Sequence, residues 1–240
     1  MEGIHSRHDG EVLVLEIDRT AKRNAIDLAM FGALADALCA AQDQAETRAV
    51  LLCGAGEGFT AGHDLQAFAQ WPQAAHGPVP RFLHALAGLR KPLVIAVHGW
   101  AVGIGATALL HADWVLADPD AVLRFPFVDP GIAPEAGASL LLAPAVGTLR
   151  ARQLLLGGGA ITAREACDWG LVTELAARVE LRGAALARAR DLAAKPQGMV
   201  RPTKEWPAPA DARHARIDEE IEAINQAVRE RRLPAATPEP

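Results

Sequence analysis

LVIAVHGWAVGIGATALLHADWVL, the stretch from Leu93 to Leu116, is where the fold of this chain can be predicted most directly. Its apolar residues Leu93 to Val97 predict a buried strand, and the glycines between residues 99 and 105 then allow the backbone to turn tightly. A short helix is expected from Ala106 to His111. Because the first turn of a helix leaves backbone N–H groups unpaired at the positive end of the dipole, this turn is suited to hold an oxyanion or a phosphate.

The same turn also fits a dinucleotide-binding fingerprint. Gly103 to Ala108 matches the pattern G-x-G-x-x-A, and Asp118 ends the next apolar run, as a ribose-binding acid would. The context argues against this interpretation, because His98 to Val102 separate the strand from the fingerprint and only about two turns of helix fit before the next strand. Two alternatives stay open: an anion site, or glycines that only allow a helix to pack closely on a strand.

Length and composition indicate a soluble globular protein. The 240 residues, half of them hydrophobic, are enough to bury a sizeable core as one domain with a small appendage. Lys and Arg number 24 against 29 Asp and Glu, so the net charge of -5 gives no basic excess for nucleic acid or an anionic membrane. We expect neither as a partner.

The cysteines and the N-terminus predict a cytoplasmic location. Cys39, Cys53 and Cys167 are odd in number and far apart, which favours buried reduced thiols over a disulfide framework or a zinc site. The first ten residues contain no apolar leader segment, and no run approaches the roughly 20 apolar residues that a membrane-spanning helix needs.

A second glycine-rich loop follows an earlier strand. Ala49 to Cys53 is apolar, and Gly54 to Leu65 (GAGEGFTAGHDL) leads from it to the start of a helix. Upstream, a strand is expected from Val12 to Ile17 and a helix from Asp27, as its N-cap, to about Asp43. If the strands before the two glycine loops lie side by side, both loops bring backbone donors near one point.

Four segments, in this order and spacing, resemble the signatures of the crotonase, or enoyl-CoA hydratase/isomerase, superfamily. They are Arg19 to Ala25 (RTAKRNA), Phe59 to Leu65 (FTAGHDL), Pro92 to Gly105 (PLVIAVHGWAVGIG) and Phe125 to Ser139 (FPFVDPGIAPEAGAS). The resemblance implies an α/β fold, in which repeated strand-strand-helix units stack as a spiral. It also implies acyl-CoA thioester substrates, a homotrimer or dimer of trimers, no metal, and no cofactor beyond the coenzyme A of the substrate.

The resemblance assigns roles to residues of the glycine loops. The thioester oxygen would be held by the backbone N–H groups of His63, which follows Gly62, and of Ile104, which follows Gly103. The side chain of His63 is not required for that role. The remaining expected substrate contacts are Lys22, Arg23 and Ala25 at the CoA moiety, together with Ala61, Gly62, Asp64, Leu65, Gly103 and Phe127; Asp64 also suits a helix cap.

The expected acid-base residue is Glu135. Where hydratases of the superfamily carry two glutamates, this chain has Thr107 and Phe127, which cannot move a proton from a carboxyl group. Glu135 resembles the single glutamate of the delta3,delta2-enoyl-CoA isomerase branch, although a glutamate after Pro134 also suits the first turn of a helix. Asp129 is the other carboxylate in this segment. Hydratase-type activity and a non-catalytic acyl-CoA-binding homologue are the alternatives to isomerisation.

The rest of the chain is expected to be scaffold. Residues 1–194 would form the spiral core with the acyl-CoA site, and residues 195–240 a helical segment used for oligomerisation, with a disordered tail from Leu233. Prolines after Lys195 are expected to break regular structure before a last helix with an apolar stripe. The apolar stripe consists of Ile217, Ile221, Ile224 and Val228. The other expected elements are a strand at Trp114 to Ala117 and helices at Leu140 to Val146, Arg150 to Leu156 and Leu181 to Ala194. A further helix is expected to start at Thr162, with Glu165 completing a capping box.

Overall fold

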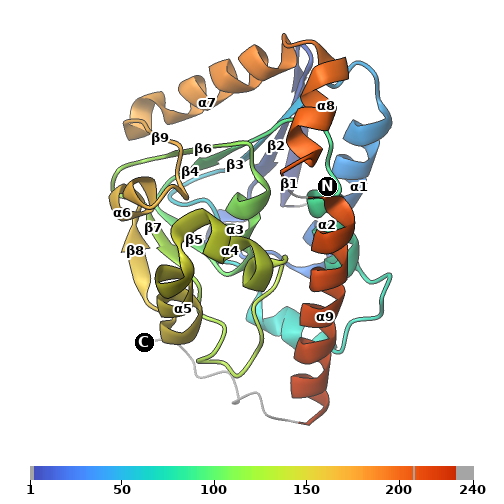
Figure 1. Cartoon of the computed structure of the whole chain (residues 1–240), viewed down its shortest axis with the longest axis vertical. Coiled ribbons are helices and arrows are strands. Elements are labelled where there is room, and N and C mark those ends of the chain that lie inside the picture. Colours follow the sequence, from blue (N-terminus) through green and yellow to red (C-terminus); the bar gives the residue numbers. More distant parts are fainter. Residues whose placement is uncertain (1–2, 208, 231–240) are drawn as a thin grey trace.

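The structure, a computed structural model, describes residues 3–207 and 209–230. Within these residues the strands form two sheets (Figure 1). The larger sheet has the order β1-β2-β3-β4-β6-β9, and the smaller one the order β5-β7-β8. The strands are β1 (Ile4–Asp9), β2 (Val12–Ile17), β3 (Ala49–Gly54), β4 (Leu93–Val97), β5 (Trp100–Val102), β6 (Trp114–Ala117), β7 (Val122–Arg124), β8 (Ala160–Thr162) and β9 (Glu174–Leu175).

Helices cover both faces of the larger sheet. Among the described residues, no helix is long and apolar enough to cross a membrane. The α-helices are α1 (Leu28–Asp43), α2 (Pro78–Ala87), α3 (Ile104–Thr107), α4 (Ala138–Val146), α5 (Thr148–Gly157), α6 (Ala163–Asp168), α7 (Arg178–Ala193), α8 (Gln197–Glu205) and α9 (Ala210–Arg229). The 3-10 helices are η1 (Thr20–Lys22), η2 (Leu65–Gln70) and η3 (Ala108–His111).

From β4 to β7, successive strands alternate between the two sheets, which gives this part of the fold its spiral form. β4 lies in the larger sheet and β5 in the smaller one, and β6 and β7 repeat this step. β4 pairs in parallel with β6, and β5 pairs in parallel with β7, so each turn of the chain stacks on the one before. This is the α/β spiral that the resemblance implied.

The core lies on both faces of the larger sheet. β4 is buried along its whole length, which explains why its sequence is a continuous apolar run without polar alternation. α7 covers one face, where Leu181, Ala185 and Ala189 pack on residues of β2, β3, β4 and β6. α1 and α2 cover the opposite face (Figure 1). Burial of each Val, Leu or Ile side chain contributes about 1.5 to 3 kcal/mol, so these strands are fixed tightly and the loops after them start from a rigid base.

Most elements expected in the first two thirds of the chain are confirmed. β2, β4 and β6 have the predicted bounds, and α1 begins after Asp27, whose side chain accepts a hydrogen bond of 2.9 Å from Met30 N. The capping box of Thr162 and Glu165 is also present. The helix after the second glycine turn begins at Ile104 and not at Ala106, so it starts directly after Gly103.

Several elements were not predicted, among them the short strands β5, β7, β8 and β9 and the longer elements β1, α2 and α8. β1 is mostly exposed at the edge of the sheet, so its sequence shows little alternation of apolar and polar residues. The Asp9-Gly10 pair between β1 and β2 is a hairpin signal that could have indicated this strand. α2 lies in a stretch for which no element was predicted. The expectation that prolines break the chain after Lys195 was wrong for α8, because Pro196 takes the N-cap position and the helix continues through Pro202.

The last helix differs from the prediction in its partner. Ile217, Ile221 and Ile224 are buried, because α9 packs along α2 and against α4 of the same chain (Figure 1). The apolar stripe therefore needs no second subunit to cover it. Asp113, which lies between η3 and β6, accepts hydrogen bonds from Leu93 N and from Lys204 of α8. The predicted disorder from Leu233 onward lies outside the described residues.

The three cysteines are free thiols, as predicted, but only Cys53 is fully buried. Its burial raises the pKa of this thiol to about 11, so it remains protonated and unreactive near neutral pH. Cys39 is exposed and Cys167 is half-buried, so the expectation that all three are buried was wrong for these two.

Candidate active site

The two glycine loops meet, as the sequence predicted. β3 and β4, the strands that precede them, are parallel neighbours in the larger sheet. Beyond the strands the contact continues, because Thr60 forms a parallel bridge with Ala101 and Val102 N donates a 3.0 Å hydrogen bond to Thr60 O. The backbone after each strand is therefore held against the backbone after the other.

Glycine is required at the closest point of this contact. Gly62 has a φ of +89°, and a Cβ atom placed on it would lie 2.7 Å from the carbonyl oxygen of Val102. Gly103 has a φ of +55°, also in the region that disfavours L side chains. The glycines thus serve a close approach of two loops, in addition to shaping each turn.

The residues that follow these glycines have fixed backbones. Ile104 is the first residue of α3, so its N–H is among those that a helix leaves without a partner inside the helix. The peptides on both sides of His63 are held: Gly62 O accepts a 2.7 Å hydrogen bond from Ile26 N, and Asp64 N donates to Ile26 O over 2.9 Å. Both positions are rigid points at the meeting of the loops.

The carboxylate of Glu135 lies against both loops. Glu135 is 5 % exposed, and its Oε2 atom is 3.6 Å from Nδ1 of His63. On the other side, a Cβ atom placed on Gly103 would lie 3.9 Å from Oε1 of the same carboxylate. The structure therefore brings Glu135, His63 and Ile104, the three residues expected to be catalytic, to one place from three separate segments.

The turn that carries Glu135 is unusual in its backbone. Ala136 and Gly137 have φ angles of +59° and +71°, so the chain turns left-handed twice before α4 begins. His111 of η3 contacts Ala136 O at 2.7 Å, and burial is the main reason that the pKa of His111 is lowered to about 4. A neutral imidazole therefore secures the turn at neutral pH.

Glu220 of α9 secures the same turn from the opposite side. Its carboxylate accepts hydrogen bonds from Gly137 N at 2.6 Å and Ser139 N at 2.9 Å, which are donors at the start of α4. Burial is the main reason that the pKa of Glu220 is raised; hydrogen bonds from Ser139 and Gly137 act to lower it, and the charge of Glu135 raises it further. Sequence reasoning did not find Glu220, because it lies 83 residues after Gly137.

Thr107 and Phe127 offer no acid-base group. Thr107 is fully buried and its hydroxyl lies 3.3 Å from Gly103 O in the preceding turn of the same helix. Phe127 is 2 % exposed and belongs to the hydrophobic core. Asp129, the other carboxylate considered, is largely exposed and lies 3.8 Å from the guanidinium of Arg124. Glu135 is therefore the carboxylate that these segments place at the loops.

The expected CoA-contacting loop is anchored to the first glycine loop. Lys22 and Arg23 are exposed and Ala25 is half-buried. Asn24 between them is buried, and its side-chain amide donates to Ala55 O and Gly58 O, both over 2.8 Å. The cations of this loop thus face solvent on a backbone held in a fixed position relative to the loops. Asn24 was not singled out from the sequence, although its place before Ala25 in a polar loop was a signal for a turn.

The remaining expected contact residues lie on the first glycine loop. Ala61 is half-buried, Gly62 is buried, and Leu65 begins η2 with 61 % of its surface exposed. Asp64 accepts a hydrogen bond of 2.6 Å from Arg19 and one of 2.9 Å from Gln66 N. Burial is the largest influence and acts to raise the pKa of Asp64, but the hydrogen bonds from Arg19 and Gln66 N and the charges of Arg19 and Lys22 together outweigh it, so the pKa is lowered. This fits its interpretation as a cap.

Comparison with known proteins shows the family to which the chain belongs. The family model described as enoyl-CoA hydratase/isomerase matches residues 7–229 of the chain. The chain belongs to the enoyl-CoA hydratase/isomerase family. This confirms the resemblance to the crotonase superfamily that the four sequence segments carried, and with it substrates of the acyl-CoA thioester class.

Similar members of the family carry several names. The chain is 34% identical over 207 residues to a 1,2-epoxyphenylacetyl-CoA isomerase of Escherichia coli K12, covering 82% of this chain and 78% of the relative. It is 32% identical over 195 residues to a carnitinyl-CoA dehydratase of Salmonella paratyphi A, covering 80% and 74%. A crystal structure of an enoyl-CoA hydratase/isomerase from Pseudoalteromonas atlantica T6c superposes with a TM-score of 0.90 at 33% identity, covering 98% of this chain and 100% of that one.

Proposed function

We propose that the protein is an acyl-CoA isomerase that moves the double bond of a 3-enoyl-CoA thioester to the 2-position, with Glu135 as its base. The observation that carries the proposal is the place of the Glu135 carboxylate, between His63 and Gly103 at the meeting of the two glycine loops. A base in that place stands beside any thioester whose oxygen lies between the N–H groups of His63 and Ile104.

Glu135 and the two backbone N–H groups account for each step of the proposed reaction. Glu135 takes a proton from C2 of the thioester, and the electron pair moves onto the thioester oxygen, which becomes an enolate oxygen. The N–H groups of His63 and Ile104 donate hydrogen bonds to that oxygen. In other enzymes, removal of one such donor raises the activation free energy by about 2.7 to 4 kcal/mol. Glu135 then returns the proton at C4, so a single carboxylate suffices.

Hydration of a 2-enoyl-CoA is the second candidate. The 32% identity to a carnitinyl-CoA dehydratase favours it, because dehydration is the reverse of such a hydration. The site supports isomerisation better, since a hydratase must position water and deliver a proton, and the two positions expected for that task hold Thr107 and Phe127. The hydroxyl of Thr107 points back to its own helix, and Phe127 is apolar.

Substrate binding and assembly complete the proposal. We place the CoA moiety along the exposed cations Lys22 and Arg23, near Ala25, with no cofactor or metal beyond the substrate's own CoA. We place the enzyme in the cytoplasm, where thiols such as the three free cysteines stay reduced.

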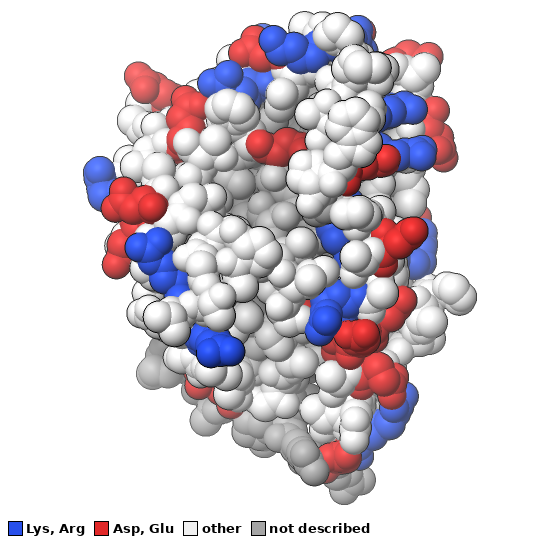
Figure 2. Space-filling model, viewed as in Figure 1, with Lys and Arg blue, Asp and Glu red and all other residues white. Residues whose placement is uncertain are grey.

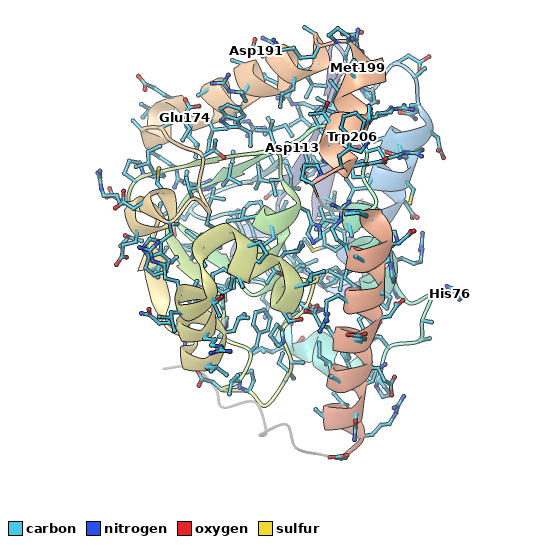
Figure 3. The ribbon with its side chains drawn as sticks, viewed as in Figure 1. His76, Asp113, Glu174, Asp191, Met199 and Trp206 are labelled. Carbon is cyan, nitrogen blue, oxygen red and sulfur yellow. The ribbon has the colours of Figure 1, made fainter. Side chains whose placement is uncertain are left out.

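We also propose a homotrimer or a dimer of trimers, for a reason other than the stripe on α9. α8 has no buried residue in the single chain, and Met199 and Trp206 on and beside it are 66% and 77% exposed (Figure 3). Leu149 and Leu156 of α5 are 80% and 66% exposed, and charged side chains are sparse over the middle of this face (Figure 2). Exposed apolar groups of this kind typically mark an interface. A monomer in analytical ultracentrifugation at micromolar concentration contradicts this part.

The reaction is tested with purified protein and a panel of 3-enoyl- and 2-enoyl-CoA thioesters, following double-bond migration and hydration separately. We expect isomerisation to exceed hydration. Glu135→Gln keeps the shape of the side chain and removes the base, so it should lower kcat by about 10²- to 10⁴-fold while the protein still folds and binds acyl-CoA. A Glu135→Gln variant with unchanged kcat refutes the role of Glu135, and a Glu135-dependent hydration faster than isomerisation selects the second candidate.

A further inference from the structure

The imidazole of His63 is more deeply buried than the proposed role of the His63 backbone N–H group requires. Its side chain is 6% exposed, and so is that of Glu135, with Nδ1 of the first 3.6 Å from Oε2 of the second. The N–H group proposed to hold the thioester oxygen belongs to the main chain, so any side chain at position 63 could supply it. The proximity of this ring to Glu135 therefore calls for a separate explanation.

Two aromatic side chains fix the plane of the ring. The centroid of Phe31, from α1, lies 4.4 Å from that of His63, in a tilted arrangement. Trp71 meets the ring edge-on with centroids 6.1 Å apart. Aromatic contacts at these distances hold preferred geometries, so the two neighbours limit rotation of the imidazole and keep one ring nitrogen directed at the carboxylate.

The separation of 3.6 Å is longer than a hydrogen bond and lies within the range of an ion pair. Hydrogen bonds between catalytic groups are often long in the absence of substrate and shorten when it binds. Two titratable groups from other elements face the segment of Glu135: the charge of Glu135 acts on Glu220 of α9, and His111 of η3, neutral at neutral pH, contacts the next residue, Ala136. Neither of these two contacts involves the His63 ring.

We propose that His63 is a positioning residue for Glu135. In the tautomer protonated at Nδ1, the ring donates a hydrogen bond to Oε2 and so holds the carboxylate group in one orientation. The other oxygen, Oε1, then stays beside Gly103, on the side of the N–H of Ile104. This inference rests on the proposed function, because it assumes that Glu135 removes the proton from C2 of the thioester.

The chemical effect is one of orientation. A glutamate side chain has a broad terminal torsion, so without a partner its carboxylate samples many orientations. Proton transfer requires the accepting oxygen to face C2 while the thioester oxygen rests on the two N–H groups. A misplacement of about 1 Å can cost about 10²-fold in rate, and the loss falls on kcat because substrate binding uses the backbone and the CoA loop.

Two substitutions separate this role from simple packing. His63→Asn keeps an N–H donor near the position of Nδ1 and loses the aromatic contacts, whereas His63→Phe keeps the aromatic contacts and loses the donor. Both keep the backbone N–H. We expect His63→Phe to lower kcat by about 10²-fold with KM changed less than about threefold, and His63→Asn to stay within about tenfold of the original kcat. His63→Leu, smaller and without a donor, serves in place of Phe if that variant does not fold.

The outcomes decide between the roles. A His63→Phe enzyme with the original kcat, or a His63→Asn enzyme that loses as much as His63→Phe, overturns the proposal. The proposed function is judged separately, by Glu135→Gln: if that variant loses activity while His63→Phe does not, only the positioning role fails. If Glu135→Gln keeps full activity, the proposed base is wrong and the failure lies there.

Discussion

Replacement of Gly62 by alanine tests whether the close approach of the two loops builds the site. A Cβ atom on Gly62 would lie 2.7 Å from the carbonyl oxygen of Val102, whereas ordinary van der Waals contact begins at 3.4 Å. The backbone of one loop therefore has to retreat by about 0.7 Å, and this movement costs about 1 to 3 kcal/mol, as overpacking does elsewhere. The positive φ of +89° adds about 1 to 3 kcal/mol of its own.

Gly147→Ala is the matched control. Gly147 has nearly the same φ, +88°, but nothing lies within 4 Å of a Cβ atom placed there, and it joins α4 to α5 away from the loops. Both variants should lose stability in urea unfolding, and Gly62→Ala should lose about 1 to 3 kcal/mol more. Because the retreat moves the N–H of His63 or of Ile104, kcat of Gly62→Ala should fall by about 10²- to 10³-fold, while Gly147→Ala keeps its activity. Equal stability and equal kcat in the two variants would refute the reasoning.

Three further predictions concern the surroundings of the site. The double variant Lys22→Glu and Arg23→Glu should weaken CoA binding in calorimetry, and the loss should shrink as salt rises, whereas Lys195→Glu, an exposed lysine at the end of α7, should leave binding unchanged. The pKa of His111 is lowered to about 4 in the folded chain, so its contribution to the free energy of unfolding is present above pH 6.5 and is lost as the pH falls toward 4. His111→Gln should reduce the change in the free energy of unfolding across this pH range by up to about 3 kcal/mol, as measured by unfolding at several pH values. Glu220→Ala should cost about 1 to 3 kcal/mol of stability and lower kcat, because it removes the acceptor of a buried N–H group, Gly137 N, and of a partly buried one, Ser139 N, at the start of α4; unchanged melting and kcat would contradict this.

The parts of the fold that could be predicted are those in which burial is continuous. β4 and β6 are apolar along almost their whole length, so their bounds follow from composition alone. β1 could not be found in this way, since four of its six residues are exposed and an edge strand needs no apolar run. α8 has no buried residue in the chain, so hydrophobic spacing carried no information about its contacts.

Some features of the candidate site could likewise be predicted from the sequence, and others could not. Glycine is the residue that permits a close approach of backbones, so Gly62 and Gly103 could be selected from residue type and spacing. Glu135 was selected through the family resemblance, because its residue type and its place after Pro134 also suited the first turn of a helix. The direction of a side chain depends on contacts between distant segments. The aromatic neighbours of His63 come from α1 and from the loop after η2, and neither has a spacing that connects it to Glu135.

Glu220 connects the turn that carries Glu135 to the C-terminal segment of the chain. Glu135 stands on a turn with two successive left-handed residues, a conformation that persists only where surrounding groups impose it. One of those groups is His111, from the core, and the other is the carboxylate of Glu220, from α9 in the C-terminal segment. Since α9 covers its apolar stripe on α2 and α4 of the same chain, it brings this carboxylate to the turn without help from another subunit. The C-terminal helix therefore helps to hold in place the turn that carries Glu135, the proposed base.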